Sequence, residues 1–219
     1  TARGFWLGDQ LTTWDAYDGL SSVIPGLLTS GLSGYSMQHA DTGGYLSVSA
    51  LGITRDAELF QRWVELSALT PLFRMHSTNQ PSENHQWNTD AATEAHLAKM
   101  TDVYVALAPY RETVMGEAQA TGLPVIRPLF LMYPEDDAVW PLTDQFLLGS
   151  DVLVAPVLTP GAVERTVYLP AGQWIHGVTT DVYLGGQSVT VQAPIGAPAV
   201  FVRVGADLEV DLVAAFLGG

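Results

Sequence analysis

Three short strand-like segments of the chain each deliver an ionisable side chain near their C-terminal end: Asp9, Asp41 and His76. Carboxylate and imidazole groups transfer protons and bind polar ligands. Asp41 lies 32 residues after Asp9, and His76 lies 35 residues after Asp41, so each interval has room for one helix. In a barrel of alternating strands and helices, polar groups at successive strand ends meet at one face and form the active site. The spacing therefore points to an enzyme.

Asp9 is the best single candidate for proton transfer. It follows an aromatic-rich strand, and Gly8 leaves room beside it. Apolar surroundings would favour the protonated form of this carboxyl group, which could then donate a proton near neutral pH. An aspartate at this point can equally cap the next helix, so the spacing alone leaves both interpretations open.

The second and third strand ends combine carboxylate, phenol, guanidinium and imidazole groups. Asp41 and Tyr45 flank a double glycine, although an Asp-Thr-Gly-Gly sequence also makes a good turn regardless of function. Arg74 and His76 alternate with apolar residues, so both point to the same side of a predicted strand and favour a polar pocket. A buried arginine needs a partner, for which Asp9 or Asp41 is the natural choice. A hydrogen-bonded core histidine is the alternative for His76.

A metal site is a further alternative. His39, Asp41, His76 and Asp9 could in principle supply nitrogen and oxygen ligands, and His39 and Asp41 share one strand face. The chain has no HxH or HExxH signature, however. We therefore expect neither a metal nor another cofactor.

The elements that position these groups alternate between strand and helix up to about Gly122. Strands are predicted at 5–10, 35–39 and 72–76. Apolar residues at helical spacing predict helices at 15–32, 56–69 and 89–120, the last as one helix or as two with a break near Pro109. Pro25 suggests a kink or a short break, and Gly122 is suited to cap the last helix. The polar segment 77–89 is predicted to be a loop over the site.

The pattern changes after Gly122, where we place a domain boundary. Short β-rich runs without intervening helices predict an antiparallel β-sandwich over 123–205. The runs are 125–133, 145–148, 152–157, 166–169, 173–176, 188–192 and 199–204. Residues 206–219 are left as a tail, with a short helix at 208–217.

Composition excludes several classes of protein. The 219 residues include 23 acidic and 9 basic side chains, for a net charge of -14, which is opposite to what nucleic acid binding requires. No apolar run approaches the roughly 20 residues that a membrane span needs. Cysteine is absent, which excludes disulfides and fits a reducing compartment, so we expect a cytoplasmic protein. A homo-oligomer is compatible with the sequence.

Taken together, the motifs resemble the C-terminal half of a glycoside hydrolase family 31 enzyme. The resemblance extends over most of the chain in the same order. The matching pieces are Trp6-Leu7-Gly8-Asp9-Gln10, His39-Ala40-Asp41-Thr42-Gly43-Gly44-Tyr45, Arg62-Trp63, Thr70-Pro71-Leu72-Phe73-Arg74-Met75-His76, Gly122-Leu123-Pro124-Val125-Ile126-Arg127-Pro128-Leu129-Phe130, Gln145-Phe146-Leu147-Leu148-Gly149-Ser150-Asp151-Val152-Leu153-Val154-Ala155-Pro156-Val157, and Tyr168-Leu169-Pro170 with Trp174.

The resemblance implies a fold class and an activity. The fold would be α/β, with residues 1–122 forming the C-terminal part of a (β/α)8 TIM barrel, about strands six to eight, ahead of the β-sandwich. Within the family the chain is most similar to the sulfoquinovosidases, which release sulfoquinovose from α-glycosides such as sulfoquinovosyl glycerol. The pointers are Gln10, where α-glucosidases usually carry Asn, and Tyr45, where they usually carry Phe. The Tyr45 hydroxyl can bind a sulfonate directly or through water.

The family also implies residue roles. Asp9 matches the general acid/base of a retaining two-carboxylate mechanism. His76 matches a residue that binds sugar hydroxyls, and Arg74 and Asp41 match the pocket wall. The expected ligand is a small-molecule glycoside.

Part of the family pattern is missing. No aspartate precedes Asp9 to match the family's nucleophile, and the sulfonate-binding Arg and Trp are also absent. Arg3 is too close to Asp9 to match the family's sugar-binding arginine. We therefore expect an N-terminal remainder of the same enzyme to complete the site, and we expect the chain alone to be inactive and prone to aggregate. The alternatives are an α-glucosidase or α-xylosidase of the same family, an inactive carbohydrate-binding homologue and, most distantly, a metal-dependent barrel hydrolase.

Overall fold

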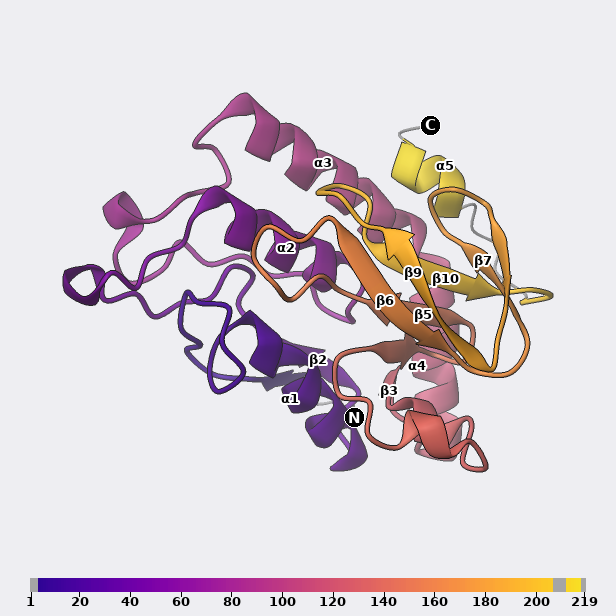
Figure 1. Ribbon diagram of the computed structural model, residues 1–219. Coiled ribbons are helices and arrows are strands. Elements are labelled where there is room, and N and C mark those ends of the chain that lie inside the picture. Colours follow the sequence, from indigo (N-terminus) through magenta and orange to yellow (C-terminus); the bar gives the residue numbers. More distant parts are fainter. Residues whose placement is uncertain (1–3, 207–211, 218–219) are drawn as a thin grey trace.

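The computed structural model describes residues 4–206 and 212–217. Figure 1 shows an α/β part, in indigo to magenta, beside a part built from the orange and yellow strands. In the first part, β1 (Gly4–Trp6) pairs in parallel with β2 (Met37–His39), and Trp6 stands opposite His39. The next segment continues this order, because Thr42 and Met75 form a parallel bridge. Three successive chain segments therefore lie side by side and run in one direction, as in a barrel wall.

The strand predicted at 72–76 is wrong as a strand. Met75 forms only a single bridge, and one backbone hydrogen bond, from Thr42 N to Arg74 O (2.9 Å), connects the segment to its neighbour. The reason lies in the neighbouring segment, which turns away after Thr42. Gly43 and Gly44 both have positive φ (90° and 74°), which extended strand backbone does not allow.

The helices agree with the sequence in number but not always in length. The α1 helix runs through Pro25 without a break. It spans Leu20–Leu32, so the predicted start at residue 15 is wrong. The Asp15 side chain instead accepts hydrogen bonds from the backbone N–H groups of Tyr17 and Asp18 (both 2.9 Å), which holds a turn. The other helices are α2 (Ala57–Ala68), α3 (Ala91–Ala106), α4 (Ala108–Thr121) and α5 (Leu212–Leu217).

Caps explain where the helices begin and end. The Asp56 side chain accepts from the N–H of Leu59 (2.8 Å) at the start of α2. Gly122 takes the left-handed conformation (φ 81°) after α4, which confirms it as the C-cap. The predicted alternative of two helices near Pro109 is also confirmed, with the break at Leu107. In the tail, residues 208–211 and Arg3 at the other end lie outside the described residues.

The remaining short elements lie mostly in loops. Over the described ranges, 3₁₀ helices occur at Ser49–Leu51, Pro81–Glu83, Leu129–Leu131 and Asp137–Val139. The predicted β run at 125–133 is therefore mostly wrong, because only Ile126–Arg127 is strand before Pro128 leads into a 3₁₀ turn. No helix among the described residues is long and apolar enough to cross a membrane.

The second part contains two antiparallel sheets. The six-stranded sheet has the order β3-β4-β5-β10-β7-β8, and β6 pairs with β9 in a two-stranded sheet. Most predicted runs are confirmed as strands, but β8 was missed. The bounds are β3 (Ile126–Arg127), β4 (Phe146–Leu148), β5 (Val152–Ala155), β6 (Glu164–Leu169), β7 (Gln173–His176), β8 (Val182–Leu184), β9 (Gln187–Gln192) and β10 (Ala199–Arg203).

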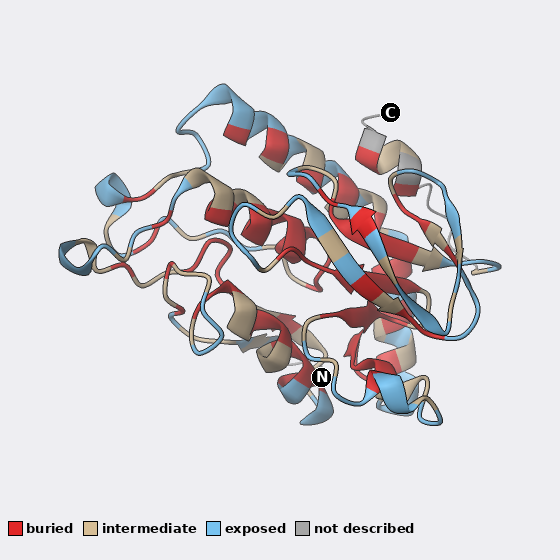
Figure 2. Ribbon diagram, in the orientation of Figure 1, coloured by how far each residue is buried: buried red, intermediate tan, exposed pale blue. Residues whose placement is uncertain are grey.

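The six-stranded sheet is buried on both faces at its centre. Alternate residues of β4, β5 and β10 join different apolar clusters, as the pleat requires. Phe146, Leu148, Val152, Val154 and Val200 pack with α1, α2, α3 and α4, while Leu147, Leu153, Ala155, Ala199 and Phe201 pack with β6 and β9. Figure 2 shows the buried residues gathered where helices and strands meet and the exposed ones in the outer loops. One cluster thus spans both sides of residue 122, and the domain boundary placed there stays a prediction.

Candidate active site

Asp9 lies just beyond the end of β1. Gly8 before it has a positive φ (100°), so the chain turns after the strand, and the Asp9 side chain is exposed. It forms no hydrogen bond or ion pair with any other residue in the described ranges. The capping alternative is wrong, because α1 begins at Leu20 and its N-cap is Gly19. A carboxyl group without a partner at a strand end is available to a bound molecule.

Gln10 ties the first strand end to the second. Its backbone carbonyl accepts hydrogen bonds from the N–H groups of Tyr45 (2.8 Å) and Leu46 (2.9 Å). Its side chain is buried and donates to the hydroxyl of Ser22 on α1 (2.9 Å), whereas Oε1 is buried without a partner. The amide nitrogen of Gln10 therefore serves the packing of α1, and its buried oxygen has unused hydrogen-bonding capacity.

Asp41 and Arg74 form an ion pair between the segment after β2 and the neighbouring segment 72–76. Arg74 Nη1 lies 3.0 Å from Asp41 Oδ1, which confirms the expectation that a carboxylate accompanies the arginine. The Asp41 side chain is buried, while that of Arg74 is half exposed. Asp41 Oδ2 is buried without a partner. The turn interpretation is confirmed as well, because the Asp41 carbonyl accepts from the N–H of Gly44 (2.8 Å).

Tyr45 and His76 face each other with their rings nearly perpendicular. The ring centroids are 4.6 Å apart and the planes make an angle of 78°. His76 Nδ1 is buried and has no hydrogen-bond partner, so a satisfied core histidine does not describe it. A hollow of about 210 Å³ opens beside His76, lined also by Met75 and Trp87. An aromatic wall with an unpaired imidazole nitrogen is suited to the hydroxyl groups and apolar face of a sugar.

His39 lies at the end of β2, close to this group. Its Nδ1 is buried without a partner, and burial lowers the pKa of its imidazole, which favours the neutral ring at pH 7. Within residues 4–206 and 212–217, no three His, Cys, Asp or Glu side chains lie close enough together to hold a metal ion. The four suggested ligands therefore do not converge in the described part of the chain.

Two family models together match nearly the whole chain. The Glycosyl hydrolases family 31 TIM-barrel domain matches residues 1–114, and the Glycosyl hydrolase family 31 C-terminal domain matches residues 122–207. The chain belongs to glycosyl hydrolase family 31.

Relatives of this family 31 chain include proteins of known structure. The chain is 46% identical over 199 residues to the sulfoquinovosidase of Agrobacterium fabrum, and this match covers 90% of the chain and 30% of that protein. Its fold superposes on a family 31 sulfoquinovosidase from E. rectale, solved with the aza-sugar inhibitor IFGSQ, with a TM-score of 0.93 at 38% identity over 97% of this chain and 32% of that one. An α-xylosidase from a soil metagenome, complexed with xylose, gives a TM-score of 0.83 at 30% identity over 94% and 33% of the two chains. The family 31 chain thus spans about a third of the length of these relatives, and the predicted fold class, a partial TIM barrel followed by a β-sandwich, is confirmed.

The sequence contains no signal for three polar residues that shape this candidate site. Asn79 exchanges two hydrogen bonds with the backbone of Ser47, and its own N–H donates to Tyr45 O (3.1 Å). The Asn84 side chain accepts from the backbone N–H of Arg55 (2.6 Å). Both asparagines lie in the polar loop predicted at 77–89, but nothing in their spacing identifies their partners. Arg55 gave no signal beyond being a lone cation before the helix cap Asp56.

Proposed function

We propose that this chain supplies the acid/base side of the active site of a retaining glycoside hydrolase that cleaves α-glycosides of sulfoquinovose, such as sulfoquinovosyl glycerol. The observation that carries the proposal is the set of joined strand ends. Asp9 carries a carboxyl group that has no partner among the residues the structure describes. It lies next to Gln10, whose carbonyl binds the N–H of Tyr45, and the ring of Tyr45 contacts His76. The identity of 46% to a sulfoquinovosidase supports the choice of sugar.

In the proposed mechanism, Asp9 first acts as an acid. It gives its proton to the glycosidic oxygen as the bond between that oxygen and the anomeric carbon breaks, while the nucleophilic carboxylate attacks the anomeric carbon from the other face. Asp9, now ionised, then takes a proton from water as the water oxygen displaces the nucleophile and regenerates the free sugar. Two displacements give net retention of the α configuration.

The pocket residues hold the sugar during these steps. His76 Nδ1 and Asp41 Oδ2 have unused hydrogen-bonding capacity that sugar hydroxyls would satisfy. The ion pair with Asp41 keeps Arg74 at the pocket wall, where half of its side chain stays exposed. The Tyr45 hydroxyl would bind the sulfonate directly or through a water molecule.

The nucleophile is proposed to come from outside residues 1–219. No aspartate precedes Asp9, and the next carboxylate along the chain, Asp15, uses its oxygens to hold the turn before α1. The experiment compares residues 1–219 alone with the full-length polypeptide that carries them. We expect hydrolysis of an aryl α-sulfoquinovoside only from the longer protein, and hydrolysis by residues 1–219 alone would contradict the proposal.

Substrate class and the role of Asp9 need separate measurements on the full-length polypeptide. We expect a higher kcat/KM for the aryl α-sulfoquinovoside than for the aryl α-glucoside or α-xyloside, and a preference for either neutral sugar would refute the choice of sugar. Asp9→Asn should lower kcat by about 10²- to 10⁴-fold with a glycerol leaving group. The loss should be smaller with an activated aryl leaving group, which needs less help from a proton. Asp102→Asn, at an exposed site on α3, is the control and should behave like the wild type.

A further inference from the structure

Arg55 is a buried cation that has no anionic partner in the part of the chain that the structure describes. The residue is only 3% exposed, and it is absent from the ion pairs formed among the described residues. Its guanidinium group instead donates to neutral oxygens: Nε to His85 O (2.8 Å), Nη1 to His76 O (3.2 Å) and Thr42 O (3.5 Å), and Nη2 to Gln86 Oε1 (3.3 Å).

This burial is unfavourable for the charge. Burial lowers the pKa of Arg55 to about 10, because the charged form loses its hydration without gaining a carboxylate. The ring of Phe60, 4.8 Å from the guanidinium carbon, provides only a weak attraction. An apolar side chain of similar length would avoid the desolvation, so stability alone does not explain an arginine here.

The partners of Nη1 identify what the arginine is suited to do. Thr42 directly follows Asp41, and His76 is itself a pocket residue, so one nitrogen binds the backbone at both of the last two strand ends. The backbones of these two segments are joined directly by the hydrogen bond between Thr42 N and Arg74 O, and the Asp41–Arg74 ion pair also connects them. Beyond that point the guanidinium group takes the place of the missing strand ladder.

The surrounding chain leaves space for this arrangement. A Cβ atom at Gly43 would lie 2.8 Å from Cδ of Arg55 and closer still to Nη1, so any larger residue at this position would displace the side chain. On the other side, the N–H of His85 donates to Arg55 O (2.9 Å), and the Asn84 side chain binds Arg55 N (2.6 Å). The loop after His76 is thereby folded around Arg55.

We infer that Arg55 is a positioning residue of the proposed glycosidase site. Its guanidinium group holds the backbone of Thr42 and His76 together, so that Asp41 and His76 present their side chains at a fixed separation. The inference rests on the proposed function for its effect on catalysis. Its structural content, that Arg55 joins the two strand ends, stands on the hydrogen bonds alone.

The test uses Arg55→Met in the full-length polypeptide, because methionine fills much of the space but donates no hydrogen bond. A displacement of about 1 Å in a site of this kind lowers rates about a hundredfold, and we expect a fall in kcat of that order. Arg55→Lys keeps one donor group and should give an intermediate kcat. This graded rescue would not arise from a general loss of packing.

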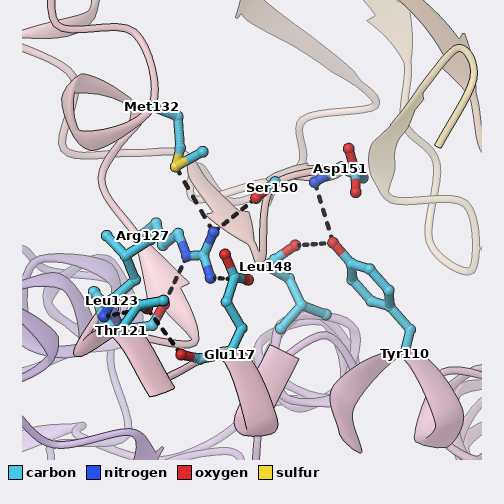
Figure 3. A network of polar contacts seen from close by, with 10 residues as sticks. Tyr110, Glu117, Thr121, Leu123, Arg127, Met132, Leu148, Ser150 and Asp151 are labelled. Carbon is cyan, nitrogen blue, oxygen red and sulfur yellow. Dashed lines mark hydrogen bonds and ion pairs between the residues drawn. The ribbon is translucent and has the colours of Figure 1, made fainter. Parts of the chain in front are cut away.

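Arg127→Met is the matched control. Arg127 is also fully buried, but it binds Glu117 (2.6 Å), Ser150 (2.7 Å) and Pro124 O (2.8 Å) where α4 meets β3, and it contacts none of the candidate site residues (Figure 3). This variant should lower Tm at least as much as Arg55→Met, yet leave kcat within about threefold of the wild type at temperatures where both proteins are folded.

Crystal structures of the variants separate the two proposals. In Arg55→Met the backbone oxygens of Thr42 and His76 should move apart, whereas Arg127→Met should leave them in place. Unchanged positions would overturn the inference, as would a wild-type kcat in Arg55→Met. A wild-type protein that hydrolyses no α-glycoside would instead refute the proposed function, and the crystal structures would still decide whether Arg55 holds the strand ends.

Discussion

Titration of Glu65 should weaken the contact between α2 and the sandwich. The Glu65 side chain is buried, and it accepts hydrogen bonds from Arg62 Nη1 (3.0 Å) and from the backbone N–H of Gly196 in the loop before β10 (2.6 Å). Arg62 Nη2 in turn donates to Ala162 O in the loop before β6 (2.8 Å). Burial raises the pKa of Glu65 to about 7, and the attraction of Arg62 offsets only part of that effect.

The sign of the effect follows from the direction of this shift. The folded protein holds the Glu65 proton more tightly than the unfolded chain, whose pKa is near 4.5. The resulting stabilisation is fully present below pH 4.5 and is lost as the pH rises through about 7. One pKa unit corresponds to about 1.4 kcal/mol, so the free energy of unfolding should fall by about 3 kcal/mol over this range because of Glu65.

A neighbouring histidine acts in the opposite direction. His96 on α3 binds Gln61 O (3.0 Å), and burial lowers the pKa of its imidazole. Its contribution is therefore present above its unfolded pKa of about 6.5 and is lost as the pH falls through the lower folded value. The net pH profile of the wild type mixes both groups, so only the difference from a Glu65 variant isolates the carboxyl group.

Glu65→Gln resembles the protonated carboxyl group at every pH. We expect the variant and the wild type of the full-length polypeptide to have similar unfolding free energies at pH 5, and the variant to be the more stable at pH 7.5. Calorimetric unfolding across this range measures the difference, and Glu112→Gln, at an exposed position of α4, is the control without an effect. Parallel pH profiles for the wild type and Glu65→Gln would refute the reasoning.

Two further predictions concern the second strand end. Gly44→Ala should destabilise the protein by about 2 kcal/mol in denaturant unfolding, because φ is 74° and the new Cβ would lie 2.8 Å from Leu11 O. The control Gly116→Ala, in open space on α4, should be neutral or stabilising, and equal effects of the two substitutions would contradict this prediction. Asp41→Asn should lower the free energy of unfolding by about 2 kcal/mol, because it weakens the charge-assisted hydrogen bond to Arg74. A double-mutant cycle with Arg74→Gln should show coupling between the two residues, whereas additive losses would show that the pair contributes nothing to stability.

The sequence predicted the elements better than the contacts between them. Helix α2 was predictable from its apolar face and from Asp56, whose side chain caps it. The predicted start of the first helix was wrong because the carboxylate of Asp15 binds nearby backbone N–H groups, a local alternative that apolar spacing does not reveal. The third strand was overestimated for a different reason, since a strand needs a neighbour and Gly43 turns that neighbour away.

In the candidate site, too, residues with a local sequence signal were predictable and residues defined by distant contacts were not. Asp9, Asp41 and His76 were recognisable because each was predicted at a strand end, and the three parallel segments do lie side by side although the last forms only one bridge. The pairing of Arg74 with Asp41 followed from charge, although the buried member of the pair is the carboxylate and the arginine is half exposed. Arg55 was not predictable, because most of its partners are backbone oxygens of distant residues, and every residue type offers the same oxygen.

Helix α2 connects the candidate site to the sandwich. At the site it begins just after Arg55, and the hydroxyl of Ser67 near its other end binds that of Thr42 (2.9 Å). On the sandwich side, Arg62 and Glu65 bind the loops before β6 and β10. A packed helix moves as a unit, so a change that loosens the sandwich loops can shift both the Arg55 and the Ser67 contacts at once. We therefore expect the sandwich loops to influence the geometry of the candidate site through α2, the helix that contacts both.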